Sequence, residues 1–435
     1  MEKVIKVGLL GLGTVGKGVY RILAGNVENI SRKIGARLEI ARILVRSLDK
    51  DRGLEIDPAV LTTDYRDVID DSEIEIVVEV MGGLHPALDY ARQALKNGKS
   101  LVTANKDLIA QHGRELFEAA AANAADLLFE GSVGGGIPII RPLKHCLAAN
   151  RILKIMGIIN GTTNYILSKM TAEGAGFAEA LAEAQARGYA EADPSADIEG
   201  LDAARKLAIL ASIAFNSRVG LDDVYVEGIS RITARDIAYA GELNYVIKLL
   251  GIAKENENGI EARVHPTMIP REHPLAAVNG VFNAIYVQGD AVGDTMFYGR
   301  GAGEMPTGSA VAADVMEAAR NRLHRAAGIN GCTCFEQKPV LPVGHLQSKY
   351  YLRMTVADRP GVLASIAYAF GDKEVSLASV IQKHTDGRRA EIVLVTHRVS
   401  EQNLRDALTI VEKLSAVDEV CAVIRVEDEG VRAVG

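Results

Sequence analysis

The glycine-rich stretch at residues 8–20 constrains the fold of this chain most strongly. It follows a run rich in β-branched residues and leads into an apolar segment of helical spacing, and Gly11, Gly13 and Gly16 match G-x-G-x-x-G. Between a strand and a helix, such glycines allow a tight turn, approach of the backbone to a pyrophosphate, and close packing of the helix on the sheet. The helix N-terminus then favours an anion. The stretch predicts a dinucleotide site, with an ordinary glycine turn as the alternative.

Strand-like and helix-like segments alternate as far as residue 137. Strands are predicted to end near Arg46 and Thr103, with further strands at 74–83 and 126–133 and an alanine-rich helix at 108–125. This alternation predicts a parallel, doubly wound sheet of the Rossmann type over residues 1–137. Ligands bind at the carboxyl ends of such strands, so Lys106, just beyond Thr103, is expected to face the same region as the glycine turn.

The end of the second strand bears on the choice of dinucleotide. A NAD-specific unit usually carries Asp or Glu there, to bind the ribose hydroxyls. This chain has Arg46 at that point, with Lys50 and Arg52 beyond it. Basic residues at the end of this strand suit the 2′-phosphate of NADP, so NADP is favoured and NAD is not excluded. The alternative is that these residues are merely solvated charges of a loop.

Composition excludes several classes of protein. The chain has 435 residues, 48% of them hydrophobic, which is enough for two or three domains, and no apolar run is long enough to span a bilayer. A net charge of -7 without a dense basic block argues against nucleic-acid partners. Lys3 and Lys6 interrupt any signal peptide. The four cysteines form no C-x-x-C pair, and Cys332 and Cys334 are too close for a usual zinc half-site, so we expect reduced thiols in a cytoplasmic protein.

The pattern changes after residue 137. Mixed strands and helices over 138–302 predict a second α/β domain, with Thr162 or Thr163 as an expected helix N-cap, and a helix at about 303–325 is expected to return to the first domain. Residues 326–347 have little periodicity and are taken as a linker. Residues 348–430 follow the order β-α-β-β-α-β of a ferredoxin-like unit and are expected to form a separate module.

Residues 188–215 carry the most informative chemistry. Asp202 and Lys206 lie four residues apart, on one face of a predicted helix that is almost wholly apolar from Leu207 to Phe215. Lys206 is therefore expected to be partly buried, which suits it to proton transfer near neutral pH. The alternative to a catalytic lysine is an ordinary surface ion pair between Asp202 and Lys206, preceded by an acidic loop that resembles a calcium-binding loop. This loop lacks the residue spacing of an EF-hand, which argues against calcium. Its acidic residues are Glu191, Asp193, Asp197 and Asp202.

Several stretches occur together in the order and spacing of one family. They are GLLGLGTVGKGV, TANK, EGSVGGGIPII, INGTTNYIL, the loop E-x-D-P-x-x-D-x-x-G-x-D-x-x-x-K, and YGRGAGEMPTGSAV. The chain resembles homoserine dehydrogenase up to about residue 325, and the acidic-loop motif is highly specific. The DRPGVL turn at 358–363 and the element order after it resemble an ACT domain, which senses amino acids. Nothing resembles the kinase region of the fused aspartokinase form.

The resemblance implies roles at matching positions. Lys206 matches the proton donor or acceptor, and Lys106 matches a second essential lysine near cofactor and substrate. The expected substrate-binding residues are Glu191, Asp202, Asp197, Gly161 and Thr162. Gly11, Thr14, Val15 and Gly303 match nucleotide-contacting positions. From the glycine fingerprint and the predicted strand ends, Gly13, Gly16, Arg46, Thr103 and Lys106 are also expected to bind the cofactor. The backbone positions that hold a monovalent cation (Na⁺ or K⁺) in relatives match Glu130, Val133, Gly135 and Ile137.

The implied reaction is the reversible, NAD(P)H-dependent reduction of L-aspartate 4-semialdehyde to L-homoserine, in threonine, methionine and isoleucine biosynthesis. The resemblance also implies a homo-oligomer, a dimer or tetramer, inhibited by an amino acid, threonine by analogy. Two rivals remain. A hydroxyacid dehydrogenase with an ACT tail needs a His–carboxylate pair and a late fingerprint, whereas this fingerprint starts at residue 11. A non-catalytic dinucleotide- and amino-acid-sensing regulator would have no reason to keep Lys106, Asp202 and Lys206 together.

Overall fold

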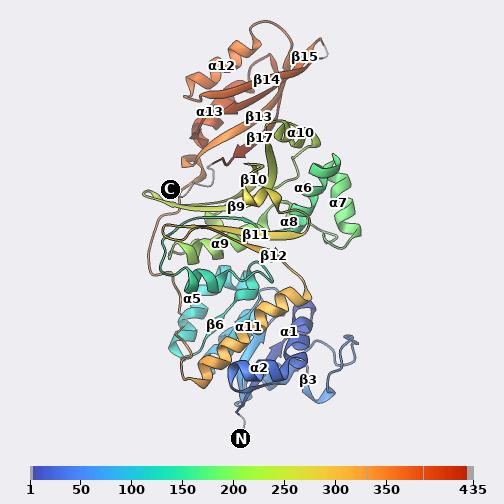
Figure 1. Cartoon of the computed structure of the whole chain (residues 1–435), viewed down its shortest axis with the longest axis vertical. Coiled ribbons are helices and arrows are strands. Elements are labelled where there is room, and N and C mark those ends of the chain that lie inside the picture. The colour runs from blue at the N-terminus through green and yellow to red at the C-terminus, as the bar shows by residue number, and fades with distance from the viewer. Residues whose placement is uncertain (1–2, 330, 386, 429–435) are drawn as a thin grey trace.

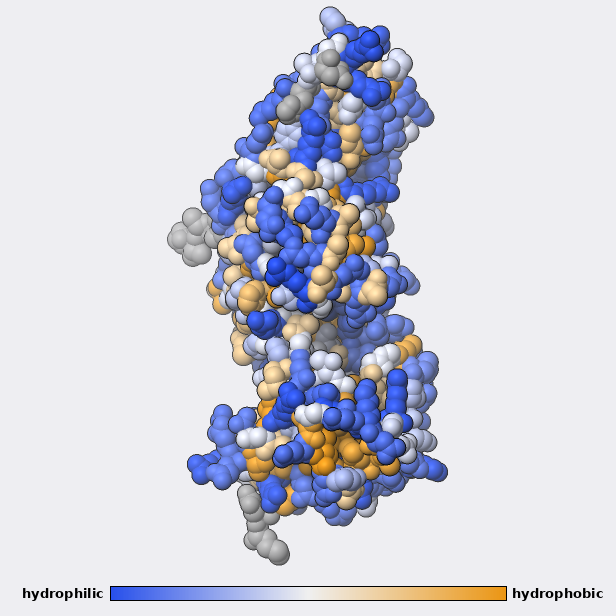
Figure 2. All heavy atoms as spheres, turned by 90° about the vertical axis from the view of Figure 1, so that its right-hand side faces the viewer, coloured by the Kyte–Doolittle hydropathy of each residue, from blue (hydrophilic) through white to orange (hydrophobic). Residues whose placement is uncertain are grey.

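A computed structural model describes residues 3–329, 331–385 and 387–428. Three regions follow one another along an elongated molecule, with the N-terminal region at one end and the C-terminal region at the other (Figure 1). Figure 2 shows the same regions as successive lobes. Within the described ranges, no helix is both long and apolar enough to cross a membrane.

The N-terminal region is built on a six-stranded parallel sheet of order β3-β2-β1-β4-β5-β6. The strands are β1 (Val4–Leu10), β2 (Arg37–Leu44), β3 (Leu61–Thr62), β4 (Ile74–Glu79), β5 (Ser100–Thr103) and β6 (Leu127–Leu128). The helices are α1 (Thr14–Gly25), α2 (Val27–Ile34), α3 (Arg66–Ile69), α4 (Ala87–Lys96) and α5 (Lys106–Ala122). This strand order is that of a dinucleotide-binding Rossmann sheet, so the predicted fold class is confirmed for this region.

Helix α5 begins at Lys106, two residues earlier than the predicted helix at 108–125. Asn105 is its N-cap, and the Asn105 side chain accepts a hydrogen bond from the backbone N–H of Leu108 at 3.2 Å. This cap replaces one of the missing intrahelical bonds and fixes where the helix starts. Lys106 therefore occupies the first turn of α5.

Helix α11 (Glu304–Leu323) lies across α1 (Figure 1). The two helices approach closely because glycines face each other: a Cβ on Gly18 would lie 2.0 Å from the Glu304 carbonyl oxygen, and one on Gly308 would lie 2.7 Å from the Gly18 carbonyl carbon. Arg21 also forms an ion pair with Glu304 at 2.7 Å. The chain thus returns to the first region after passing through the second.

The middle region contains a mixed sheet with helices packed against it. Its strands are β7 (Ile152–Ile158), β8 (Tyr225–Val226), β9 (Tyr245–Asn256), β10 (Gly259–Pro270), β11 (Phe282–Gly289) and β12 (Gly293–Arg300). Its helices are α6 (Gly161–Glu173), α7 (Phe177–Ala186), α8 (Ser195–Ile198), α9 (Leu201–Ala214) and α10 (Ala234–Glu242). Residues Pro142–Cys146 form a short π-helical segment. Residues Leu207–Ala214 of α9 are buried throughout, so α9 is a core helix.

The C-terminal region has the predicted β-α-β-β-α-β order. Its elements are β13 (Gln347–Ala357), α12 (Val362–Asp372), β14 (Leu377–Thr385), β15 (Arg389–Thr396), the two-residue β16 (Val399–Ser400), α13 (Glu401–Val411) and β17 (Val417–Val426). The strand order is β17-β13-β15-β14, with antiparallel neighbours. This arrangement confirms the expected ferredoxin-like module.

The C-terminal module is not separate from the middle region, contrary to expectation. Strand β17 pairs in parallel with β10, where Arg425 and Val426 lie opposite Thr267 and Met268. Glu427 follows directly, and its carboxylate binds three cations of the middle sheet, Lys154 at 3.0 Å, Lys254 at 2.7 Å and Arg263 at 3.3 Å. Sequence reasoning did not predict the pairing of β17 with β10, because pairing between strands of different regions leaves no local pattern in the sequence.

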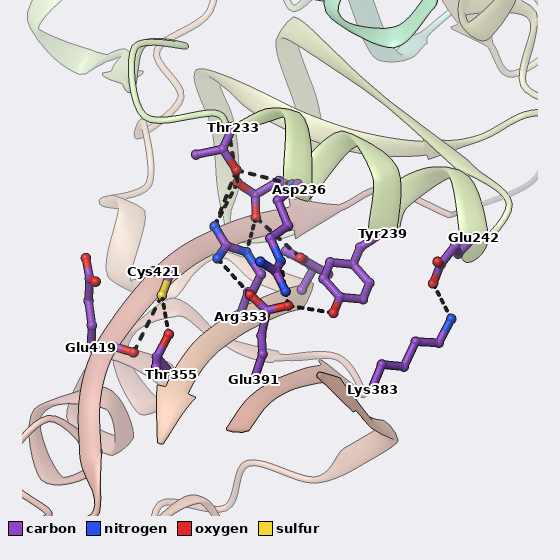
Figure 3. Close-up of polar contacts among 12 residues, drawn as sticks. Thr233, Asp236, Tyr239, Glu242, Arg353, Thr355, Lys383, Glu391, Glu419 and Cys421 are labelled. Atoms are coloured by element: carbon purple, nitrogen blue, oxygen red, sulfur yellow. Dashed lines mark hydrogen bonds and ion pairs between the residues drawn. The ribbon is translucent and has the colours of Figure 1, made fainter. Parts of the chain in front are cut away.

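A second buried contact fixes the module to α10 (Figure 3). The guanidinium of Arg353 on β13 donates to Asp236 on α10 at 2.8 Å and to Glu391 on β15 at 3.2 Å. The Tyr239 hydroxyl of α10 donates to Glu391 at 2.6 Å. Charged groups from both regions thus satisfy one another where water is excluded.

The two connections between the first and second regions run side by side. The backbone N–H of Gly136 donates to the Arg300 carbonyl at 3.0 Å. A Cβ on Gly135 would lie 2.4 Å from the Gly301 carbonyl oxygen, so only glycine allows this approach.

Candidate active site

Two lysines from different regions share one carboxylate. Asp202, in the first turn of α9, lies 2.6 Å through Oδ2 from Lys206 Nζ and 3.2 Å through Oδ1 from Lys106 Nζ. Lys206 also donates to the Ile159 carbonyl at the end of β7, at 2.9 Å. The structure therefore brings together the three residues on which the sequence hypothesis depended.

The Lys206 side chain is 12% exposed, as expected of a partly buried lysine, and that of Asp202 is 11% exposed. Burial alone would raise the pKa of Asp202, but the charges of Lys206 and Lys106, with hydrogen bonds from Lys206 and Asn160, outweigh it and hold the pKa well below its ordinary value. Asp202 is thus a fixed anion that orients two cations at the boundary between the regions.

Asn160 belongs to this cluster, although sequence reasoning did not select it. Its side-chain nitrogen donates to Asp197 at 2.7 Å and to Asp202 at 3.0 Å. Its side-chain oxygen accepts from the Thr163 N–H at 2.9 Å, which makes Asn160 the N-cap of α6. The expectation that Thr162 or Thr163 caps this helix was wrong. An Asn directly before the Gly-Thr-Thr start of a helix was the available signal.

The other predicted substrate residues lie at varying distances from the cluster. The Thr162 hydroxyl donates to Asp197 at 3.0 Å, which ties the start of α6 to the acidic loop. Gly161 precedes it, and a Cβ there would lie 2.9 Å from the Val281 carbonyl oxygen. Glu191 is exposed on the loop, and only its backbone carbonyl is held, by Gln185 at 3.1 Å. Hydrogen bonds thus join Asp197 and Thr162 to the cluster, with Gly161 directly before Thr162, whereas Glu191 is exposed and its side chain is not placed in the cluster.

The glycine turn has the shape of a cradle. Gly11 adopts φ +102, a conformation that favours glycine, and a Cβ on Gly16 would lie 2.4 Å from the Gly11 carbonyl oxygen. A Cβ on Gly13 would meet nothing within 4 Å, so the space beside Gly13 is open. Thr14 and Val15 begin α1 directly after it. Gly303, with φ +125, precedes α11, whose first residues pack on α1.

A buried carboxylate supports the end of strand β5. Thr103 donates through its hydroxyl to Glu79 at 2.7 Å, and the Met81 N–H donates to the same carboxylate at 2.8 Å. Burial raises the pKa of Glu79, and these hydrogen bonds oppose that rise. The Thr103 hydroxyl is thus already hydrogen-bonded to Glu79 within the N-terminal region. Sequence reasoning missed Glu79, because an acidic residue inside an apolar strand carries no spacing signal.

Arg46 and Arg52 both follow strand β2, but their side chains are arranged differently. Arg46 is exposed beyond β2, whereas Arg52 is turned back onto the carbonyls of Ser47 and Lys50.

In the loop expected to hold a cation, the Glu130 carboxylate accepts from the N–H groups of Ile139, Ile140 and Arg141 at 2.6, 2.8 and 2.8 Å. The Glu130 side chain is thus engaged with backbone N–H groups, and the described residues contain no cluster of His, Cys, Asp or Glu suited to a metal.

The N-terminal region is a Rossmann sheet with an open glycine cradle, and Lys106, just beyond β5, shares Asp202 with Lys206 of α9. Together with the ferredoxin-like C-terminal module, these features define a nicotinamide-dependent oxidoreductase with a regulatory domain. Family models agree: "homoserine dehydrogenase, NAD binding domain" matches residues 11–130, "homoserine dehydrogenase" matches 138–316, and "ACT domain" matches 350–416. The chain belongs to the homoserine dehydrogenase family. The non-catalytic regulator is not favoured.

Three relatives match over nearly the whole chain, and an archaeal structure matches over 72% of it. Homoserine dehydrogenase of Synechocystis sp. is 50% identical over 97% of this chain and 99% of its own length, and that of Bacillus subtilis is 45% identical over 98% and 99%. The crystal structure of a homoserine dehydrogenase from Thiobacillus denitrificans has a TM-score of 0.94 at 47% identity, covering 99% of both chains. A hyperthermophilic archaeal homoserine dehydrogenase in complex with NADPH has a TM-score of 0.62 at 28% identity, covering 72% of this chain and 97% of its own.

Proposed function

We propose that this chain catalyses the reversible reduction of L-aspartate 4-semialdehyde to L-homoserine, in the biosynthesis of threonine, methionine and isoleucine. The observation that carries the proposal is the sharing of Asp202 by Lys106 and Lys206, at 3.2 and 2.6 Å. Two ammonium groups held by one anion, at the carboxyl end of a Rossmann strand, suit a reaction that develops negative charge on a carbonyl oxygen.

The residues present fit a nicotinamide dinucleotide. The open space beside Gly13 and the N-terminus of α1 would hold the pyrophosphate, with Gly11, Thr14, Val15 and Gly16 shaping the turn. When bound, the dinucleotide supplies or accepts the hydride at the aldehyde carbon. We propose NADP as the preferred form because Arg46, rather than an acidic residue, follows β2 in an exposed position.

The chain's own residues supply the proton and bind the substrate. Lys206 gives a proton to the oxygen of the aldehyde as it is reduced, directly or through water, and Lys106 stabilises that oxygen electrostatically. Glu191 and Asp202 take the substrate ammonium, and the backbone at Gly161 and Thr162, at the start of α6, takes its carboxylate. Since Asp202 already binds both lysines, it orients them as well as the substrate.

A monovalent cation would be held by the backbone carbonyls of Glu130, Val133, Gly135 and Ile137. Two observations fit this proposal. Gly134 and Gly135 adopt φ +74 and +56, which turns the loop sharply, and the Glu130 side chain is engaged with backbone amides. Such a cation would stabilise the conformation of the 130–137 loop.

Regulation by an amino acid, threonine by family analogy, is proposed for the ACT module. A groove of about 560 Å³ lies between that module and the middle region, lined by Leu404 and Arg425 on one side and by Glu199, Leu201 and Tyr225 on the other. Leu201 directly precedes Asp202, so changes at the module can reach the active site. A purely dimerising module is the alternative.

We also propose a homo-oligomer, a dimer or tetramer, in the cytoplasm. Strand β12 is an edge of the large sheet and exposes Met296 and Tyr298, at 41% and 54%. An apolar edge strand is a usual site of pairing with another chain. The cytoplasm is where a biosynthetic dehydrogenase has access to a reduced nicotinamide pool.

One assay tests the function. Full-length protein is mixed with NADPH or NADH and L-aspartate 4-semialdehyde, and the loss of dinucleotide absorbance is followed with and without L-threonine. Turnover that produces homoserine supports the proposal, and a higher kcat/KM with NADPH supports the role of Arg46. Tight dinucleotide binding without turnover would instead favour the sensing regulator, and turnover insensitive to threonine would favour the dimerising module.

A further inference from the structure

The segment that follows α11 brings two cysteines to a cavity between the helices that carry the two active-site lysines. Cys332, Thr333 and Cys334 line one side of this cavity, whose volume is about 30 Å³. Helix α5 contributes Ile109, Gly113 and Phe117, and α9 contributes Ala208, Ile209 and Ser212. The cysteines thus sit where α5 and α9 meet, away from Lys106 and Lys206 along the same helices.

The two sulfurs have different environments. Cys332 is exposed, and its Sγ accepts from the backbone N–H of Cys334 at 3.4 Å and from Arg218 Nη2 at 3.6 Å. Cys334 is half-buried, and its thiol donates to the Ser212 carbonyl of α9 at 3.7 Å. Cys332 therefore receives hydrogen bonds while Cys334 donates one.

Positive charge surrounds this pair. Arg218 contacts Cys332, and Lys144 holds the preceding backbone by donating to the Gly331 carbonyl at 3.0 Å. Lys144 Nζ also lies over the Phe117 ring, 5.2 Å from its centroid. The acidic residues nearest Lys144, Asp314 and Glu317, are engaged with Arg141 at 2.7 and 2.6 Å. The local field thus favours an anion at Cys332 over a bound metal cation.

The pKa values of the two thiols move apart for the same reason. The single thiol hydrogen of Cys334 can turn from the Ser212 carbonyl to the Cys332 sulfur. That hydrogen bond, together with the backbone N–H of Cys334 and the charges of Arg218 and Lys144, lowers the pKa of Cys332, against a rise from burial. That hydrogen bond and burial raise the pKa of Cys334. These opposite shifts favour the thiolate at Cys332 and the thiol at Cys334, which is the division between an attacking and a resolving thiol.

We propose that Cys332 and Cys334 form a hydroperoxide-sensitive dithiol whose oxidation lowers turnover. The Cys332 thiolate attacks one oxygen of hydrogen peroxide, the O–O bond breaks, and the sulfenic acid forms as hydroxide leaves and takes up a proton. Cys334 then attacks the Cys332 sulfur, its thiol proton goes to the departing hydroxide, and the S–S bond forms with loss of water. Overall, two thiols and one peroxide give one disulfide and two waters.

The size of the cavity and the contacts of Cys334 explain both the oxidant and the effect. About 30 Å³ is room for one or two waters, which suits hydrogen peroxide. Oxidation consumes the thiol hydrogen that Cys334 gives to Ser212 and removes the anion that Arg218 contacts. Both changes alter contacts at the place where α9 packs against α5, and these two helices position Lys206 and Lys106.

The test uses the full-length protein with its four cysteines. Reduced protein is treated with hydrogen peroxide, the disulfide is mapped by mass spectrometry, and turnover is measured before and after dithiothreitol. We expect a Cys332–Cys334 disulfide, a fall in turnover and its recovery on reduction. Cys332→Ser should abolish all three effects, and Cys334→Ser should leave a sulfenic acid on Cys332 that dimedone traps.

Two further measurements distinguish Cys332 from an ordinary exposed thiol. Cys332 should react with iodoacetamide at pH 7 roughly tenfold faster than exposed Cys146, since an ordinary thiol is only a few per cent thiolate at that pH. Arg218→Gln should slow that reaction without affecting Cys146. Equal rates at Cys332 and Cys146, no disulfide after peroxide, or a disulfide with unchanged turnover would each overturn the proposal.

Discussion

Lys106 Nζ lies 3.2 Å from Asp202 Oδ1, and this contact joins the first turn of α5 in the Rossmann region to the first turn of α9 in the middle region. Because the other oxygen of Asp202 binds Lys206 at 2.6 Å, the relative position of the two lysines depends on how the two regions meet. A change in the angle between the regions therefore changes the charge arrangement at the site itself.

Replacing Lys206 by Ala should lower kcat by about two orders of magnitude or more, the usual effect of removing a general acid. Dinucleotide binding should be unchanged, because Lys206 lies on α9 and the glycine cradle precedes α1. Steady-state kinetics and NADPH fluorescence titration measure the two effects. Lys33→Ala, on the exposed surface of α2, is the matched control. Near-normal turnover of the Lys206 variant would remove this residue from the mechanism.

Two glycines of the fingerprint should respond differently to alanine. Gly13→Ala should leave the melting temperature unchanged, because its Cβ meets no atom within 4 Å, yet weaken dinucleotide binding by filling the cradle. Gly16→Ala should also destabilise the domain, since its Cβ would lie 2.4 Å from the Gly11 carbonyl oxygen. Calorimetry and cofactor titration of both variants test this. Full affinity in the Gly13 variant would contradict a pyrophosphate at this turn.

Glu427→Gln should cost about 3 kcal/mol or more of unfolding free energy, because it removes the carboxylate that three buried cations share. Asp428→Asn, which alters the neighbouring and more exposed pair with Lys349, should cost less than about 1 kcal/mol. Urea denaturation at pH 7 measures both. A Glu427 variant as stable as the control would show that the pairing of β17 with β10 suffices to hold the module.

The effect of Glu427→Gln should also depend on pH. Burial alone would raise the pKa of Glu427, but Lys254, Lys154 and Arg263 lower it below its ordinary value. A carboxyl with a lowered folded-state pKa stabilises the fold above its unfolded pKa of about 4.3, and this stabilisation disappears as the pH falls toward the folded value. The gap between wild type and variant should therefore narrow below about pH 4. A constant gap would contradict the ion cluster.

Lys248 should make stability rise with pH in alkaline solution. Its ammonium is buried and donates to the Val278 carbonyl and to the side chains of Asn164 and Asn279, and burial lowers its pKa from 10.5 to about 8. The unfolded chain then binds more protons than the folded one between about pH 8 and 10.4, so unfolding free energy increases by up to about 3 kcal/mol over this range. Lys248→Met should lack this increase, whereas Lys33→Met should keep it. Parallel curves for wild type and Lys248→Met would refute the assignment.

The parts of this fold that sequence reasoning recovered are those with a local signature. The G-x-G-x-x-G turn, the β-α alternation and the β-α-β-β-α-β order each follow from spacing within one segment. The burial of Lys206 followed from the apolar run after it, because the helical period places its neighbours in the core.

What the sequence did not reveal depends on contacts between distant segments. Asn160 joins the site only because α6 starts beside α9, and Glu79 matters only because Thr103 lies on the neighbouring strand. The pairing of β17 with β10 links residues more than a hundred positions apart. The cap at Asn160 was missed for a local reason: Asn160, Thr162 and Thr163 lie within four residues and each can cap a helix, so the choice depends on which residue comes directly before the first helical turn.

The paired crossings at Gly136 and Arg300 have a mechanical consequence. Because the backbones of the two crossings are hydrogen-bonded and in close contact, neither can bend without displacing the other. Any rotation of the dinucleotide region about these crossings therefore acts on both of them at once, and it moves Lys106 relative to Asp202.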